Sequence, residues 1–285
     1  MSPLLILAIG MAVVVGMILV LRVNAFLSLI TAALLVSVLS PGPLPERITR
    51  VSEAFGRTAG SIGIVIALAA VIGRCMMESG AADRIVRSLQ SAFGVRRTPL
   101  ALAASGYTLS IPVFFDTVFY LLIPLARSLY RRTGGHYLLY VLAISIGALA
   151  THTLVPPTPG PLIVADQLGV DLGVMIPVGL LVAITTGVAG LLFARVLDRR
   201  MPVPMRPLGT APEPEPLPDS QLPGLVWSAL PIVLPVALIS SKTASSTLAR
   251  GEASPGFWTQ TAELSGLVGN PNFALLVSAA VAVFV

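Results

Sequence analysis

Long apolar runs alternate with short polar or charged segments along the whole chain of 285 residues. A helix needs about 20 mostly apolar residues to cross a hydrocarbon core of roughly 30 Å, and several runs approach or exceed that length. A transmembrane β-barrel would instead show short segments of alternating polarity. The pattern therefore predicts an all-α polytopic membrane protein. The apolar runs cover residues 3–21, 25–39, 59–77, 99–126, 138–164, 172–196, 222–240 and 272–285.

Composition agrees with a membrane protein and removes several other classes. The chain is 55% hydrophobic and only 11% charged, whereas a soluble domain is nearer a quarter charged. Its net charge of +5 comes from short arginine clusters between the apolar runs, so nucleic-acid binding is not expected. One cysteine and two histidines exclude an internal disulfide and a multi-cysteine or His-rich metal site. A phosphate-binding G-x-x-x-x-G-K-[ST] loop is absent, and we expect neither a cofactor nor a metal.

The distribution of arginines predicts that residues 98–126 form a re-entrant hairpin. Arginines flank this segment on both sides, and its length is too short for two full crossings, which need about 40 residues. A hairpin that enters and leaves on the cytoplasmic side keeps both clusters inside, as the positive-inside rule requires. Counting back along the chain places the N-terminus outside and makes residues 41–58 an external loop, the one exception to the rule. Re-entrant backbone must be buried in protein or face water, so the hairpin implies a cavity.

The centre of the predicted hairpin contains a proline break, Pro112, and an acidic residue, Asp116, in an otherwise apolar setting. An aspartate at mid-membrane costs about 3 kcal/mol on insertion scales, so such a residue is a candidate for function. The alternative is that Asp116 only caps the N-terminus of the second hairpin helix. Both roles could hold together.

A second break lies within residues 138–164, where "THTLVPPTPGP" interrupts an apolar run. Its prolines supply no backbone donors, which predicts an unwound segment inside a span. Broken helices aim free amides, free carbonyls and helix ends at substrates or coupling ions. A proline-rich turn at the external membrane surface is the alternative. The prolines are Pro156, Pro157, Pro159 and Pro161.

The two motifs together resemble the gluconate permease family, the gluconate:proton symporters. The hairpin motif stands as "IPVFFDTVFYLLIPL" at residues 111–125, and the second motif as "THTLVPPTPGP" at residues 151–161. The opening of the chain resembles the start of the family as well. This chain departs from the gluconate transporters at two places. They carry Tyr-Glu where this chain has Phe115-Asp116, and His where it has Thr158. These departures bear on the substrate, since the family also takes related sugar acids and, in one branch, D-serine.

The resemblance implies the fold of the ion transporter superfamily, with two inverted repeats that each hold a hairpin and a broken helix. Residues 1–196 would form the first repeat, 197–221 a cytoplasmic Pro-rich linker, and 222–285 the start of the second. Family members are longer, so we expect this chain to stop inside the second repeat and to carry about half of the site. Dimers are common in the superfamily, which makes a homodimer possible.

The resulting expectation is a secondary active transporter of the bacterial inner membrane, without enzymatic activity. It would import gluconate or a related small sugar-acid anion by proton symport. The substrate carboxylate would contact backbone amides and the residues Ser110, Thr153, Thr158 and Gly160.

Asp116 suits proton coupling because an ionised carboxylate repels an anion. His152, which could instead be a packing residue, is the second candidate for that role. The alternatives are a relative that carries another substrate, an intramembrane enzyme, or a passive channel. An enzyme would need a third catalytic partner beside Asp116 and His152, and none is evident.

Overall fold

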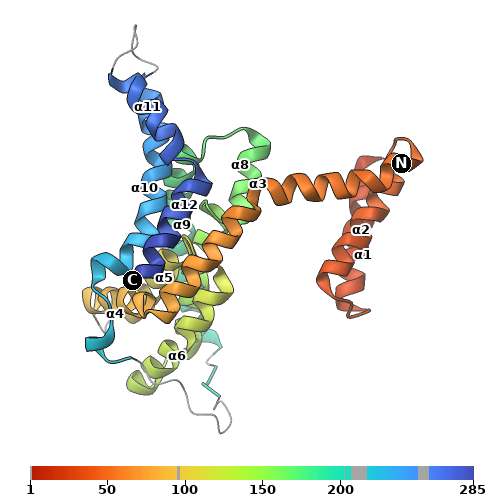
Figure 1. Ribbon diagram of the computed structural model, residues 1–285. Coiled ribbons are helices and arrows are strands. Elements are labelled where there is room, and N and C mark those ends of the chain that lie inside the picture. The colour runs from red at the N-terminus through yellow and green to blue at the C-terminus, as the bar shows by residue number, and fades with distance from the viewer. Residues whose placement is uncertain (1, 95–96, 202, 207–216, 250–256) are drawn as a thin grey trace. The chain divides into compact units, whose positions relative to one another are not determined.

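The computed structural model describes residues 2–94, 97–201, 203–206, 217–249 and 257–285, and every regular element in these ranges is helical (Figure 1). The chain divides into two compact units, Met1–Gly63 and Ile64–Val285. The helices are α1 Pro3–Leu19, α2 Ala25–Leu39, α3 Leu44–Glu78, α4 Ala81–Phe93, α5 Thr98–Leu109, α6 Phe115–Thr133, α7 Tyr137–Leu154, α8 Pro159–Leu168, α9 Leu172–Arg200, the short 3₁₀ helix η2 Asp219–Gln221, α10 Leu225–Ala249, α11 Phe257–Val268 and α12 Pro271–Phe284.

The helix lengths confirm the prediction of an all-α polytopic membrane protein. Among the described residues, four helical segments are long and apolar enough to cross a membrane. Three shorter helices, α1, α2 and α12, are also apolar. The long segments are Pro45–Glu78, Tyr137–Leu168, Leu172–Arg200 and Leu225–Thr247.

The first unit pairs α1 with α2 and adds the beginning of α3. The two helices approach closely at Gly10, where a Cβ atom would lie 2.6 Å from Cγ2 of Val36. The Ser37 hydroxyl donates a hydrogen bond of 2.5 Å to the backbone carbonyl of Arg47, which joins α2 to α3. Small residues and a side-chain hydrogen bond are typical of helix contacts in membranes.

The prediction of a loop at residues 41–58 is wrong for most of that segment, because α3 begins at Leu44 and continues to Glu78. The segment is charged, and charged segments between apolar runs are often loops. Glu, Arg and Ala are strong helix formers, however, and a proline near the first turn starts a helix without losing an internal hydrogen bond. Glu46 in the first turn also favours a helix N-terminus.

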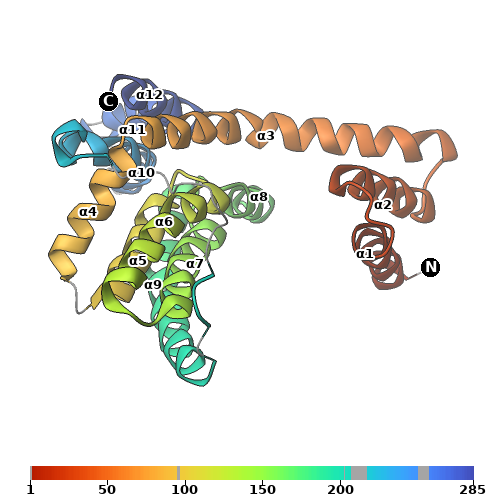
Figure 2. The same cartoon turned by 90° about the horizontal axis from the view of Figure 1, so that it is seen from below.

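The centre of the second unit is a group of helices in which α5 and α6 both pack against α7 (Figure 2). Helices α5 and α7 share its most extensive interface, and glycines make their close approach possible. A Cβ atom on Gly147 would lie 2.0 Å from the carbonyl oxygen of Ala103, and one on Gly106 would lie 2.7 Å from that of Ile144. The backbones of the two helices are therefore in direct contact.

Helix α4 is amphipathic, with Ile85 and Val86 buried on its apolar face. Burial raises the pKa of the Asp83 carboxyl, and the neighbouring Arg87 guanidinium opposes that rise. Arg87 also pairs with Asp219, at the far end of the Pro-rich segment. Of the predicted linker, the first residues belong to α9, and residues 202 and 207–216 lie outside the described parts of the chain.

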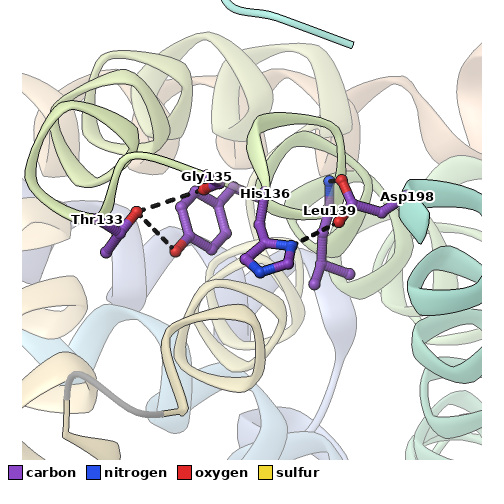
Figure 3. Close-up of polar contacts among 6 residues, drawn as sticks. Thr133, Gly135, His136, Leu139 and Asp198 are labelled. Carbon is purple, nitrogen blue, oxygen red and sulfur yellow. Dashed lines mark hydrogen bonds and ion pairs between the residues drawn. The ribbon is translucent and has the colours of Figure 1, made fainter. Parts of the chain in front are cut away.

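A polar cluster joins the end of α6, the start of α7 and the end of α9 (Figure 3). Asp198 of α9 is 8% exposed, and its Oδ1 accepts a hydrogen bond of 3.2 Å from the Leu139 amide in the first turn of α7. Its Oδ2 lies 2.6 Å from Nδ1 of His136. Nearby, the Tyr140 hydroxyl donates to Oγ1 of Thr133. Asp198 therefore caps α7 from a neighbouring helix, a role that no local sequence pattern indicates.

Replacing Gly147 by alanine is expected to destabilise the protein, because the new methyl group would collide with a backbone carbonyl that cannot rotate away. We expect a loss of roughly 1–3 kcal/mol, measured as a lower unfolding midpoint in detergent. Gly187→Ala is the matched control, since a Cβ atom there meets nothing within 4 Å in the helical α9. That variant should gain about 0.5–1 kcal/mol from helix propensity. Equal stability of the two variants would contradict the close α5–α7 contact.

Replacing Asp198 by alanine should leave the Leu139 amide without its acceptor and remove the partner of His136. The expected loss is roughly 1–3 kcal/mol of unfolding free energy, the usual result when a buried polar group loses its partner. Asp166→Ala removes an exposed carboxylate at the end of α8 and should change stability by less than about 0.5 kcal/mol. Similar unfolding midpoints for both variants would show that Asp198 does not cap α7.

Candidate functional site

The turn between α5 and α6, residues 110–114, is called the hairpin tip. Helix α5 ends at Leu109 because Pro112 follows closely, and a residue that precedes proline disfavours the helical region. The chain makes one irregular turn, in which the Val113 amide donates to the Leu109 carbonyl at 3.3 Å. Phe114 is extended, with φ −64° and ψ 147°, and starts α6. Pro112 is among the fully buried residues, so the tip is enclosed by protein.

The interruption between α7 and α8, residues 155–158, is called the proline break. Val155 and Thr158 each precede a proline and are extended, as that position requires. The peptide bond between Pro156 and Pro157 is cis. The Thr158 hydroxyl donates to the Val155 carbonyl at 2.7 Å, so one carbonyl freed by the break is paired within it. Pro159 then begins α8, where a proline costs no helical hydrogen bond.

The structure brings the hairpin tip and the proline break into contact. The space between them is too small to admit a water molecule. Ile66 and Ala69 of α3 complete its walls, which contain no lysine or arginine. The remaining lining residues are Pro112, Val113 and Phe114 from the tip, and Pro157, Thr158 and Pro159 from the break and the start of α8.

His152 of α7 also joins the two segments. Its ring lies against that of Phe114 in an edge-to-face arrangement, with 5.9 Å between the ring centroids. Asp116, in the first turn of α6, is near enough to interact electrostatically with His152. The two residues that the sequence singles out for proton coupling are therefore within electrostatic range of one another, although 36 positions separate them in the chain.

Two helix N-termini converge where the tip meets the break, because Phe114 and Thr158 are the N-caps of α6 and α8. The first amides of a helix have no internal acceptor and carry partial positive charge, which favours anions. In α8 the prolines at positions 159 and 161 leave Gly160 as the amide of the first turn without a helical acceptor. The first turn of α6 contains no proline and leaves several such amides.

Two buried polar atoms at this place have no hydrogen-bond partner within the described structure. Ser110, at the start of the tip, is fully buried, and its Oγ is unpaired. The Nδ1 atom of the half-buried His152 is buried and unpaired as well. Buried polar groups almost always have partners, so unpaired ones call for an explanation such as a ligand.

The remaining predicted site residues are placed less centrally. Thr153 is exposed, and its hydroxyl donates to the Leu149 carbonyl one turn earlier, at 2.7 Å. Gly160 is exposed, with open space where a side chain would be. Pro156 and Pro161 are buried and maintain the break. The alternative that Asp116 is the helix cap is wrong, because Phe114 holds that position and makes no side-chain cap bond.

Sequence reasoning missed Phe114 and Tyr107. Phe114 was one aromatic among several, and nothing local identified it as the partner of His152. Tyr107 lies in the apolar helix α5, and its hydroxyl donates to the carbonyl of Leu180 in α9 at 2.6 Å. A tyrosine in an apolar helix signals a need for a partner, but not where that partner lies. Within the described residues, no group of three or more His, Cys, Asp or Glu side chains could hold a metal ion.

Several known proteins with similar sequences are described as permeases or transporters. An uncharacterized permease of Haemophilus influenzae is 33% identical over 290 residues, which is 99% of this chain and 59% of that protein. A gluconate permease of Pseudomonas aeruginosa is 33% identical over 267 residues, or 92% of this chain and 57% of that protein. The Gnt-II system L-idonate transporter of Escherichia coli is 30% identical over 286 residues, which is 99% of this chain and 62% of that protein.

The chain thus spans about three fifths of the length of the curated relatives it matches. No solved structure shows significant similarity. The family model described as GntP family permease matches residues 2–285, nearly the entire chain. These relatives are transporters rather than enzymes, and the chain belongs to the GntP permease family.

Proposed function

We propose that the protein imports gluconate or a related sugar acid together with protons across the bacterial inner membrane. Its family and the bacterial gluconate and L-idonate transporters similar to it support this transport class. The observation that carries the proposal is the meeting of the hairpin tip and the proline break, with two helix N-termini and unpaired Ser110 and His152 atoms. The Arg-rich segments would face the cytoplasm and the N-terminus the outside.

The re-entrant placement of α5 and α6 is part of the proposal. Twelve residues of α5 extend about 18 Å, which is too short for the roughly 30 Å of a hydrocarbon core. A helix that ends at such depth needs protein around its free backbone groups. The packing of α5 against α7 and the burial of the tip supply that cover. Residues 1–196 would then form the first of two inverted repeats.

The substrate carboxylate would bind at the converging helix N-termini. The amide of Gly160 and the first amides of α6 would donate to it, as would the hydroxyl of Ser110. Thr158 would act differently, because its hydroxyl already donates to Val155 and has only lone pairs to offer a substrate hydroxyl. Thr153 would contribute only after leaving its bond with Leu149.

Proton coupling would follow from the absence of a fixed positive charge at the contact. An anion that binds near an ionised Asp116 is repelled, and one that binds near a protonated Asp116 is not. Substrate binding and protonation would therefore favour one another. His152 contacts the tip and neighbours Asp116, so it would pass the proton or hold it in the bound state.

The closed contact favours an alternating transporter over an open channel. Water does not fit between the tip and the break, so a substrate held between them would require the two segments to separate. The proposal is tested by uptake into proteoliposomes containing the whole encoded protein. Competition among sugar acids, hydroxy acids and D-serine would identify the substrate. Uptake that never exceeds the external concentration under a proton gradient would support a channel instead.

Asp116→Asn should abolish proton-driven accumulation, because an amide cannot take up the proton. A gradient of one pH unit is worth about 1.4 kcal/mol per proton, so the accumulation ratio should fall about tenfold. The measurement is uptake of labelled gluconate under an imposed pH gradient. Asp166→Asn changes an exposed carboxylate at the end of α8 and should accumulate substrate normally. Unchanged pH-dependent accumulation in Asp116→Asn would remove Asp116 from the coupling role.

Ser110→Ala should weaken substrate binding about tenfold without loss of stability. Its buried hydroxyl is unpaired in the free protein, so removing it should leave the unfolding midpoint equal or slightly higher. Ser105→Ala is the matched control, since this fully buried serine of α5 already donates to the Ala101 carbonyl at 2.8 Å. The control should bind substrate normally. Equal affinity of both variants, measured by half-saturation of uptake, would exclude Ser110 from the binding site.

A further inference from the structure

One turn of α9 contacts both interrupted segments of the site. The Tyr107 hydroxyl, on α5, donates to the carbonyl of Leu180 at 2.6 Å. Tyr107 lies only three positions before Ser110, where the hairpin tip begins. A helical carbonyl has two lone pairs and can accept this bond in addition to the one within its own helix. The end of α5 is thus attached to α9.

The end of α7 packs closely against the adjacent residue of α9, Gly179. A Cβ atom on Gly179 would lie 2.4 Å from the carbonyl oxygen of Leu154 and 3.5 Å from Cα of Val155. Any side chain would therefore push the proline break away from α9. Ile176 and Ala183, one turn to either side, are buried in the same core as Val155. The close approach is thus held by packing on both sides.

The two attachments fix the distance between the hairpin tip and the proline break. Both lie on consecutive residues of α9, which is helical throughout its 29 residues. The contact between tip and break has no spare room, so a small shift of either segment would alter the positions of the α6 and α8 N-termini. Binding and catalysis depend on such positions to within about 0.5 Å.

We propose that Tyr107 is a positioning residue for substrate binding, with the backbone of α9 at Gly179–Leu180 as the support that aligns the tip with the break. The inference rests on the proposed transport function and deepens it. Tyr107 does not contact the substrate. It acts by holding Ser110 and the start of α6 at the distance from α8 that the substrate carboxylate requires.

The test compares Tyr107→Phe with Tyr140→Phe in the whole encoded protein, reconstituted in proteoliposomes. Each variant removes one tyrosine hydroxyl that donates an internal hydrogen bond. Tyr107 donates near the tip, and Tyr140 donates to Thr133 at the opposite end of α7. We expect Tyr107→Phe to raise the KM for gluconate roughly two- to tenfold, the effect of one hydrogen bond. Tyr140→Phe should leave KM unchanged, and the two unfolding midpoints should shift by similar amounts.

Gly179→Ala is a second variant. It should also raise KM, because it moves the break instead of the tip. Equal KM values for Tyr107→Phe, Tyr140→Phe and the unmodified protein would overturn the positioning role and leave the transport function intact. A fall in stability confined to Tyr107→Phe, with an unchanged KM, would also overturn it by making the bond merely structural. Absence of sugar-acid uptake by the unmodified protein would overturn both proposals.

Discussion

A backbone group that leaves a helix in an apolar environment must find a new partner or lie where a partner can reach it. This constraint governs the second unit of the chain. At the proline break, the Thr158 hydroxyl donates a hydrogen bond to the Val155 carbonyl. At the hairpin tip, the Val113 amide donates to the Leu109 carbonyl. The amides that open α6 and α8 have no helical acceptor. The two interruptions line one small space, and the free first turns of α6 and α8 begin beside it.

Close packing follows from the need to enclose that place. Gly147 and Gly106 let α5 and α7 touch backbone to backbone, and Gly179 lets the end of α7 touch α9. A membrane offers little hydrophobic force between helices, so small residues and side-chain hydrogen bonds hold them together. Tyr107 and Asp198 supply such bonds at opposite ends of the bundle, and each reaches from one helix to the backbone of another.

The same arrangement links structure to the proposed chemistry. An anion site built from amides and a hydroxyl has no fixed positive charge, which makes its occupancy sensitive to the charge of Asp116. A site lined by arginine would bind an anion without help from a proton. In the proposed site, backbone donors in place of a basic side chain would be the physical reason that proton uptake and anion uptake are coupled.

Much of the fold was predictable because its signals are local. Hydrophobic runs predicted the helices, and the prolines predicted both interruptions, since proline lacks an amide donor and extends the residue before it. Charge was a poorer guide, and residues 44–58 are helical where a loop was expected. The sequence by itself determined where the helices break. Only the tertiary structure decided that the breaks meet, that Ser110 is unpaired while Thr153 is not, and that α9 supports both segments. Those features depend on neighbours far apart in the chain, and no local pattern encodes such distances.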